Sequence, residues 1–195
     1  MKIKETYISH TGLVNVGNFA LFIDVQKDGV NVDNDELVKQ STFFPRIVLL
    51  GEPFEQREDV TKFCKKIIKQ NEKIKIEIHT KGLIKPLSIP SIDNINFNVH
   101  LQLKISGLDY KQRIKSNVIN WYNQVGANFL FIINIEDELD EANLIIQENN
   151  ISKRDVYLVV EDSEQLEQVR IWAKLNGYNF APNFRKFLWK KDGRN

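Results

Sequence analysis

The sequence predicts an α/β fold, with a mostly parallel sheet and outer helices, on three observations. Short apolar runs of strand length alternate along the chain with amphipathic stretches of helical period. The repeated order of strand, helix and strand is typical of parallel βαβ units, whose helices cover the sheet. No Pro/Gly/Ser-rich linker or fixed-period repeat divides the 195 residues. We therefore expect a single domain over residues 1–195.

Apolar runs rich in Ile, Val, Leu and Phe predict the strands. The stretch from residue 26 to residue 45 is the least regular part of the chain, and it predicts an extended loop with room for one short helix. The predicted strands are Phe19–Val25, Ile47–Leu50, Ile74–Ile78, Ile95–Leu103, Phe129–Ile133 and Val156–Val160.

Amphipathic stretches between these runs predict the helices. In Val60–Ile68, apolar residues fall at i, i+3, i+4, i+7 and i+8, which gives one apolar stripe facing the core. We expect further helices over about Tyr110–Val125 and Glu138–Asn149. The last helix begins after Asp162, a good N-cap residue, and ends at Gly177, a good C-cap residue.

Composition and charge limit the class of protein. A content of 42% hydrophobic and 27% charged residues is typical of a globular protein and not of a disordered chain. The net charge of +1 gives no global field that would recruit nucleic acid or a membrane. No apolar signal region follows Met1–Thr6, and the run Phe129–Ile133 is far shorter than the roughly 20 residues of a membrane span. We expect a cytoplasmic protein with no membrane partner.

Cys64 is the only cysteine, so the chain by itself cannot form a disulfide or hold a cysteine-ligated iron-sulfur cluster. Its place on the apolar stripe predicts a small buried core residue and not a catalytic thiol. Asp28, Asp33 and Asp35 have a spacing that could supply oxygen ligands to calcium. The loop lacks the glycine and the terminal glutamate of an EF-hand, so a solvated acidic turn is favoured and we expect no metal site.

Ligands in α/β sheets and barrels bind at the carboxyl ends of the strands, so we expect them near the residues just after each apolar run. These are Asp24–Lys27, Gly51–Pro53, His79–Gly82, Lys104–Gly107, Asn134–Asp137 and Glu161 with Asp162. Glu52 follows one predicted strand, where it could bind a ligand's amino group or only begin the following helix. His79 directly follows the next predicted strand. It could act as a general base, but we favour a histidine at the rim of the sheet that is held by hydrogen bonds. The acidic stretch Glu136–Glu141 is most simply a junction between strand and helix. No coherent set of acid, base and nucleophile is present, so we expect no catalytic residue.

The C-terminal stretch combines basic and aromatic residues. Arg185, Lys186 and Lys190 interleave with Trp189. Phosphate contacts with stacking aromatic rings suit single-stranded RNA, so a nucleic-acid-binding protein is the alternative function. A final strand with apolar residues inward and lysines outward explains the same pattern and is favoured.

Five segments carry a family resemblance when they are taken in chain order. They are Thr11–Ile23, Gly51-Glu52-Pro53, His79-Thr80-Lys81-Gly82, Ser106-Gly107 and Phe180-Ala181-Pro182. In this order they resemble five features of the 7-carboxy-7-deazaguanine synthases. These are the opening loop and strand, the Gly-Gly-Glu-Pro turn, the Glu-Thr-Asn-Gly motif, the later Ser-Gly and the closing strand. That family belongs to the radical S-adenosylmethionine superfamily, and the resemblance covers nearly the whole chain.

The resemblance implies an incomplete β/α barrel, usually a homodimer, from a family that converts a carboxylated tetrahydropterin to a deazaguanine on the route to queuosine. It makes five residues the candidates for binding a ligand. These are Gly12, Glu52, His79, Thr80 and Ser106.

The chain departs from the family at the cluster. The family has a Cys-x-x-x-Cys-x-x-Cys loop after the strand that matches Phe19–Val25, and three thiolates hold the 4Fe-4S cluster there. Residues 26–45 contain no cysteine and no histidine. We therefore expect no such cofactor and no radical reaction, which makes the chain a pseudoenzyme. Two roles stay open: it binds a small pterin-, purine- or adenosyl-like ligand, or it is an assembly partner of itself or of an active paralogue.

Overall fold

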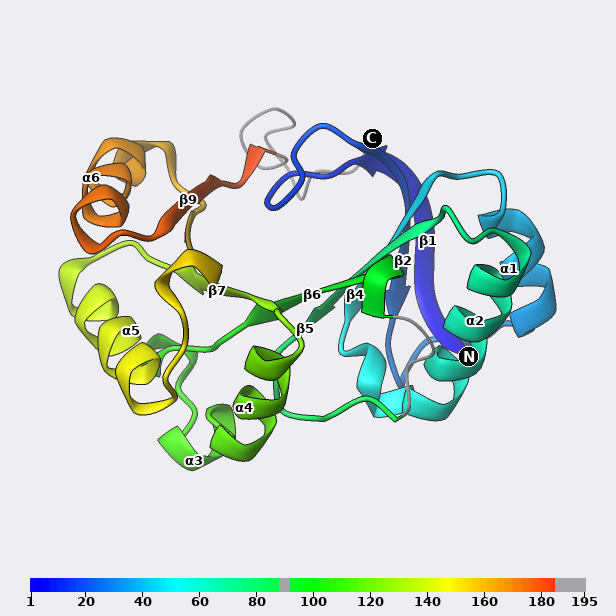
Figure 1. Cartoon of the computed structure of the whole chain (residues 1–195), viewed down its shortest axis with the longest axis horizontal. Helices are drawn as coiled ribbons and strands as arrows, with labels where there is room; N and C mark the ends of the chain where they lie inside the picture. The colour runs from blue at the N-terminus through cyan, green and yellow to red at the C-terminus, as the bar shows by residue number, and fades with distance from the viewer. Residues whose placement is uncertain (88–91, 185–195) are drawn as a thin grey trace. The chain divides into compact units, whose positions relative to one another are not determined.

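A computed structural model describes residues 1–87 and 92–184 (Figure 1). The strands of this part are β1 (Lys2–His10), β2 (Phe19–Val25), β3 (Val30–Asn31), β4 (Arg46–Gly51), β5 (Lys75–Thr80), β6 (Ile95–His100), β7 (Asn128–Ile132), β8 (Val156–Val160) and β9 (Asn179–Pro182). They form a mostly parallel sheet in the order β3-β1-β2-β4-β5-β6-β7-β8-β9. The predicted α/β class with outer helices is confirmed.

The helices of this part are α1 (Asn34–Ser41), α2 (Arg57–Gln70), α3 (Tyr110–Arg113), α4 (Ser116–Gln124), α5 (Glu136–Glu148) and α6 (Leu166–Asn176). None of the helices in the described ranges is both long enough and apolar enough to cross a membrane. The chain packs as two compact units. Unit 1 comprises residues 1–11, 17–80 and 84–97, and unit 2 comprises residues 12–16, 81–83 and the chain from residue 98 onward.

In unit 1, β1 runs antiparallel to both β2 and β3, whereas β2, β4 and β5 are parallel. The apolar stripe of α2 is buried as predicted, with Phe63 and Ile67 fully inaccessible. The sequence did not predict β1. Its residues alternate between exposed and more buried positions, as expected of an antiparallel strand with one solvated face, and polar side chains outnumber apolar ones.

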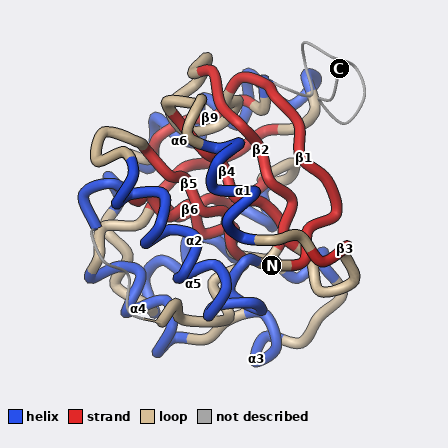
Figure 2. Tube along the Cα trace, turned by 90° about the vertical axis from the view of Figure 1, so that its right-hand side faces the viewer, coloured by secondary structure: helices blue, strands red, loops and turns tan. Residues whose placement is uncertain are grey.

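Residues 26–45 of unit 1 contain the strand β3 and the helix α1. The predicted short helix is α1, and it packs against α2 (Figure 2). Asp33 caps α1 by accepting hydrogen bonds from the main-chain nitrogens of Asp35 and Glu36, and these bonds lower the pKa of the Asp33 carboxyl. Leu37 and Val38 are each only 1% exposed. The segment thus contributes to the core of unit 1.

In unit 2, β6, β7, β8 and β9 are parallel neighbours. Leu130, Val159 and Ala181 form a buried cluster on one face of these strands. Leu13 and Val14, from the segment 12–16, pack against this cluster. The segment therefore covers part of the apolar surface at the strands of unit 2.

Two predicted boundaries in unit 2 are wrong. The strand predicted to reach Leu103 ends at His100. The helix predicted over Tyr110–Val125 is broken into α3 and α4, because Ile114 adopts an extended backbone with φ −120° and ψ 119°. That conformation buries Ile114, which is 5% exposed. Burial of an apolar side chain offsets the loss of helical hydrogen bonds at the break.

Candidate ligand-binding site

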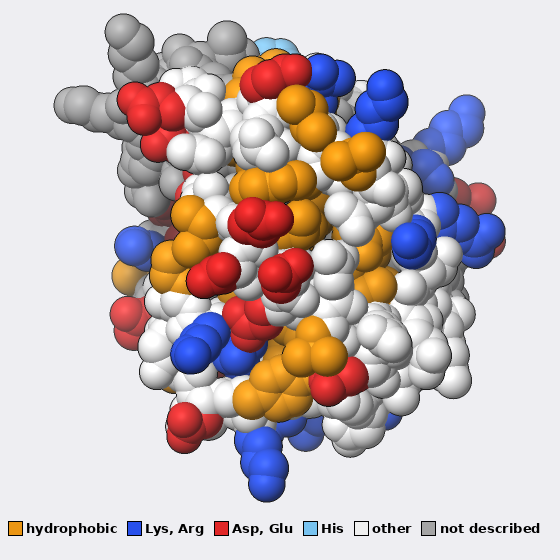
Figure 3. Space-filling view, turned by 90° about the vertical axis from the view of Figure 1, so that its left-hand side faces the viewer, with side chains coloured by type: hydrophobic (Ala, Val, Ile, Leu, Met, Phe, Trp, Pro, Cys, Tyr) orange, Lys and Arg blue, Asp and Glu red, His pale blue; other side chains and the backbone are white. Residues whose placement is uncertain are grey.

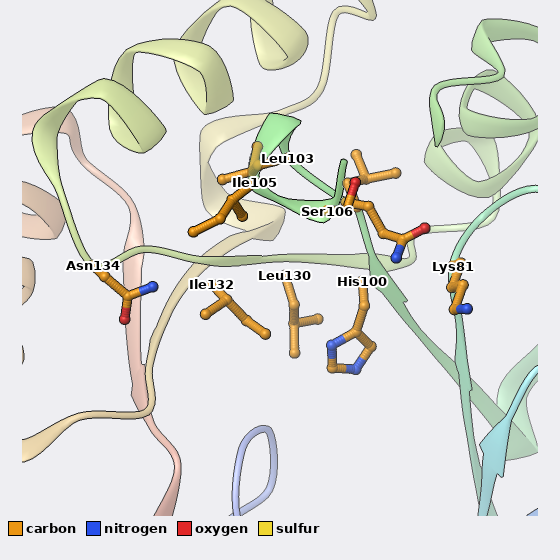
Figure 4. Close-up of a pocket in the computed structure, with 10 residues that line it drawn as sticks. Lys81, His100, Leu103, Ile105, Ser106, Leu130, Ile132 and Asn134 are labelled. Carbon is orange, nitrogen blue, oxygen red and sulfur yellow. The ribbon is translucent and has the colours of Figure 1, made fainter. Parts of the chain in front are cut away.

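The carboxyl ends of β6 and β7 border a cavity of about 280 Å³ within unit 2 (Figure 4). Five aliphatic residues line it: Leu101, Leu103, Ile105, Leu130 and Ile132. Five polar residues complete the lining: Lys81, His100, Gln102, Ser106 and Asn134. The position agrees with the general rule that ligands of α/β sheets bind outside the carboxyl ends of the strands.

Side chains from one face of β6 and β7 form one side of the cavity. His100 of β6 lies opposite Leu130 of β7, and neighbouring residues in register project to the same face. Figure 4 shows these two side chains pointing the same way from adjacent strands. Ile132 lies two residues after Leu130, so the two-residue period of a strand places it on this face as well.

The other side of the cavity is the segment that follows β6, residues 101–109. It contains the short 3-10 turn η3 (Lys104–Ser106) and provides Leu103, Ile105 and Ser106. The main-chain nitrogen of Leu101 donates to the carbonyl of Leu130 at 3.1 Å. The main-chain nitrogen of Lys104 donates to Oε2 of Glu141 at 2.8 Å. The segment is therefore tied to both β7 and α5.

A buried arginine holds the same segment in place. The Arg113 side chain donates to the carbonyl of Gln102 at 3.0 Å and to the carbonyl of Leu108 at 3.2 Å. Its guanidinium also pairs with Oε1 of Glu141 at 2.6 Å. Arg113 is only 4% exposed, so these bonds satisfy a charge that is removed from water.

Asn134 is positioned by the start of α5. Oε2 of Glu138 accepts hydrogen bonds from the main-chain nitrogen of Asn134 at 2.6 Å and from its Nδ2 at 3.3 Å. Glu138 is 5% exposed and lies in the first turn of α5, where the helix dipole favours a carboxylate. The predicted acidic junction thus has a structural role. Figure 3 shows acidic and hydrophobic side chains intermingled on this side of unit 2.

His100 is uncharged at neutral pH. Burial lowers the pKa of its imidazole to about 4, and the carboxylate of Glu161 opposes this effect only in part. Glu161 follows β8 and accepts a hydrogen bond from Nδ2 of Asn183 at 3.3 Å. A neutral imidazole offers one donor and one acceptor. His100 therefore brings an uncharged polar side chain to the cavity.

The five predicted ligand-binding residues fall in both units. Ser106 lines the cavity. Gly12 lies in the segment 12–16 of unit 2, and its carbonyl accepts a hydrogen bond from the main-chain nitrogen of Phe184 at 3.2 Å. In unit 1, Oγ1 of Thr80 donates to Oε1 of Glu52 at 2.6 Å, which joins the ends of β4 and β5.

His79 lies next to Thr80 on β5, and its side chain projects from the opposite face of the strand. Its Nε2 is 4.0 Å from Oε2 of Glu77, whose Oε1 is 2.5 Å from Nη1 of Arg46. His79 is thus part of a polar group on the sheet and is separate from the Glu52–Thr80 hydrogen bond. The nucleic-acid candidates Arg185, Lys186, Trp189 and Lys190 lie outside the described residues.

Three residues of the site were missed by sequence reasoning: His100, Gln102 and Arg113. Lys81 and Asn134 lie in the stretches His79–Gly82 and Asn134–Asp137, which follow predicted strands and were expected to face a ligand. His100 and Gln102 were placed inside a strand because Ile95–Leu103 alternates apolar and polar residues, which is the period of a strand. Asn134 follows the predicted strand Phe129–Ile133 directly. Nothing local in the sequence identifies Arg113, since its partners are between 5 and 28 residues away.

The residues of the chain do not fit a cysteine-ligated cluster. Cys64 is the single cysteine, and it lies 1% exposed on α2, where burial raises the pKa of its thiol to about 12. The place where the resemblance implies the cysteine loop is occupied by β3 and α1. Within residues 1–87 and 92–184, no group of three or more His, Cys, Asp or Glu side chains could hold a metal ion.

No protein-family model matches the chain, and no curated protein sequence matches it. Among solved structures, the crystal structure of QueE from Escherichia coli is similar over 93% of this chain and 92% of that chain, with a TM-score of 0.69. The fold is that of QueE. QueE is a 7-carboxy-7-deazaguanine synthase, so the resemblance found in the motifs is supported at the level of the fold. The sequence identity to QueE is 12%. At this level the similarity shows a shared fold and says nothing about a shared activity.

Proposed function

We propose that this chain is a cluster-less relative of the 7-carboxy-7-deazaguanine synthases that binds a small nitrogen heterocycle of the pterin, purine or adenosyl kind and catalyses no radical reaction. The observation that supports this most is the cavity at the carboxyl ends of β6 and β7. Small-molecule sites are mostly apolar hollows with a few convergent polar groups, and this cavity has that composition.

The shape of the lining suits a flat ring. Leu130 and Ile132 come from the sheet, and Leu103 and Ile105 come from the segment after β6 (Figure 4). Aliphatic side chains on two sides can contact both faces of a ring, which leaves its edge to the polar residues. The volume of about 280 Å³ lies near the lower limit of typical ligand sites, so it fits a fused ring better than a dinucleotide.

The donor set of the chain supports the absence of radical chemistry. A site-differentiated 4Fe-4S cluster needs three thiolates, and the chain has one buried thiol. The polar residues around the cavity can bind and orient a ligand. They do not form the nucleophile and base pair that covalent catalysis requires.

A binding measurement tests the proposal. The purified full-length chain is titrated with pterin, guanine and S-adenosylmethionine by calorimetry, and its melting temperature is measured with each. A ligand at about 100 times its Kd stabilises a protein by about 2.7 kcal/mol, so a rise of several degrees is expected with at least one probe.

Ile132→Trp fills the cavity and is expected to abolish that rise. Leu144→Trp is the matched control, because Leu144 is a half-exposed residue of α5 and not part of the lining. If the wild-type chain binds none of the three probes, the proposal is wrong. The role of assembly partner, of itself or of an active paralogue, is then favoured.

A further inference from the structure

The strand β1 forms an open edge of the sheet in unit 1. The strand order places β3 beyond β1, but β3 pairs only with Lys2 and Ile3. Residues 4–10 of β1 therefore have β2 on one side and, within residues 1–87 and 92–184, no strand on the other. Figure 2 shows β1 at the margin of the sheet, with β3 beside one end of it. An uncovered strand edge is a template on which another extended chain can pair.

The hydrogen-bond pattern shows which main-chain groups of β1 point to this edge. The main-chain nitrogen of Thr11 donates to the carbonyl of Asn18 at 2.9 Å. Bonded and non-bonded pairs alternate along an antiparallel ladder, so every second residue before Thr11, back to Glu5, also bonds to β2. The residues between them direct their N–H and C=O groups away from β2. These residues are Thr6, Ile8 and His10.

Only one end of β1 carries the features that protect a strand edge. Lysine side chains, β-bulges and covering strands prevent such edges from pairing. Lys2 and Lys4, a register shift between Ile3 and Glu5, and the strand β3 all lie at the N-terminal end. Residues 6–10 have no lysine, arginine, acidic residue or proline, and their register with β2 is regular. This end of β1 is therefore open to pairing.

Apolar side chains are exposed beside these main-chain groups. Ile8 is 54% exposed and Phe19 is 48% exposed. Phe19 pairs with His10 across β1 and β2, and the centroids of the two rings are 5.9 Å apart. Phe19 thus shares one face of the sheet with His10 and Ile8. A strand added at the edge covers part of this apolar surface and also satisfies the main-chain groups.

The two margins of the sheet indicate which strand fits. The opposite end of the strand order is β9, which has four residues and ends at Pro182, a residue without an N–H group. β1 has nine residues, and a second β1 in antiparallel orientation offers the same spacing of donors and acceptors. Self-pairing of residues 6–10 brings no lysine, arginine or acidic side chains opposite each other. A two-fold axis closes such a pair, so the contact does not propagate.

We propose that two copies of this chain pair through β1, antiparallel and centred on Ile8. Ile8 of one copy lies opposite Ile8 of the second copy, and Thr6 lies opposite His10 of the second copy. The outward N–H groups of these residues then donate to carbonyls of the second copy. The contact uses residues of unit 1 and none of the residues that line the cavity, so it goes beyond the proposed function.

The oligomeric state in solution tests the inference. Sedimentation velocity of the full-length chain is expected to show a dimer that dissociates on dilution. Ile8→Lys places two ammonium groups opposite each other at the centre of the contact and is expected to raise the Kd of the dimer at least about tenfold. Leu175→Lys, at a position of α6 that is 77% exposed, is the matched control and is expected to keep the wild-type Kd.

Ile8→Cys tests the register by a second measurement. The Cα atoms of a hydrogen-bonded antiparallel pair are about 5.5 Å apart, a separation that a disulfide can span. Ile8→Cys is therefore expected to form a disulfide-linked dimer under mild oxidation, whereas Leu175→Cys is expected to stay unlinked. The native Cys64 is 1% exposed, so it does not compete in this reaction.

The inference is supported if Ile8→Lys weakens the dimer and Ile8→Cys links it. A wild-type chain that stays monomeric at every concentration overturns it, and the edge is then open to an extended segment of a different protein. A dimer that Ile8→Lys does not weaken, or in which Ile8→Cys stays unlinked, also overturns it, because the two copies then meet elsewhere. None of these results depends on a ligand, so a failure here leaves the proposed function standing.

Discussion

Two segments of this chain leave the carboxyl end of a strand and then behave differently. Residues 26–45 follow β2 and fold away as β3 and α1, with Leu37 and Val38 buried against neighbouring structure. Residues 101–109 follow β6, remain beside the strand ends and line a cavity. In this chain, one segment at a strand end buries two apolar side chains on a helix, whereas the other presents apolar side chains to a cavity.

The interactions that hold the two segments in place differ as well. The first segment is held by apolar burial and by the Asp33 cap of α1. The second is held by polar bonds to Arg113 and Glu141 in addition to the burial of Leu101 and Leu103, while its Ile105 stays 74% exposed. Burial uses the apolar side chains of a segment, whereas main-chain hydrogen bonds leave side chains available to a ligand.

The largest effect is expected from Arg113→Leu. The substitution leaves Oε1 of the half-buried Glu141 and two main-chain carbonyls without the donor that Arg113 provides. Breaking one partner of a buried ion pair costs about 3–5 kcal/mol, and chemical denaturation should show a loss of this size. Arg170→Leu breaks an exposed ion pair with Glu167 and should leave the denaturation midpoint nearly unchanged. Equal midpoints for the two variants would contradict this account of the segment after β6.

A somewhat smaller effect is expected from Leu37→Ala in the segment after β2. Removing a fully buried leucine side chain costs about 2–5 kcal/mol, which the free energy of unfolding in urea would report. Ile105→Ala, in the segment after β6, is expected to change stability by less than about 0.5 kcal/mol because Ile105 is mostly exposed. The comparison between the segments would not hold if the two substitutions cost the same.

The smallest effect concerns pH and His100. Burial lowers the pKa of His100 in the folded chain to about 4, whereas an unfolded histidine titrates near 6.5. Between these values the unfolded state binds more protons, so the contribution of neutral His100 to stability is complete above about pH 6.5 and is lost as the pH falls towards 4. The stability of wild type relative to His100→Asn should therefore decrease from pH 7 to pH 5.

Urea denaturation at the two pH values measures this difference. His10→Asn is the control, because His10 is exposed on β1. A difference between wild type and His100→Asn that does not change with pH would show that the imidazole is not held in its neutral form by burial.

Sequence reasoning found the elements whose periodicity is strong. The central strands were predicted from short runs rich in Ile, Val, Leu and Phe, and the stripe of α2 from its 3.6-residue apolar period, because both are local features of the sequence. It missed β1, whose polar residues outnumber its apolar ones, and the break at Ile114, which depends on a tertiary site for that side chain.

For the candidate site, the rule on strand ends identified some of the residues that line the cavity and missed others. It selected Ser106, which lines the cavity, and Glu52 with Thr80, which share a hydrogen bond in unit 1. It also pointed to Lys81 and Asn134, which line the cavity, but it did not select His100 or Gln102. The reason is that a lining residue is defined by what faces it, and those partners come from other parts of the chain.

The sequence by itself determined the α/β class and the limit on chemistry, because hydrophobic period is local and because a single cysteine cannot supply three thiolates. Only the tertiary structure decided that residues 26–45 fold into the core of unit 1 and that residues 101–109 line a cavity. Those outcomes depend on distant partners, Arg113 with Glu141 above all, whose pairing no local pattern records.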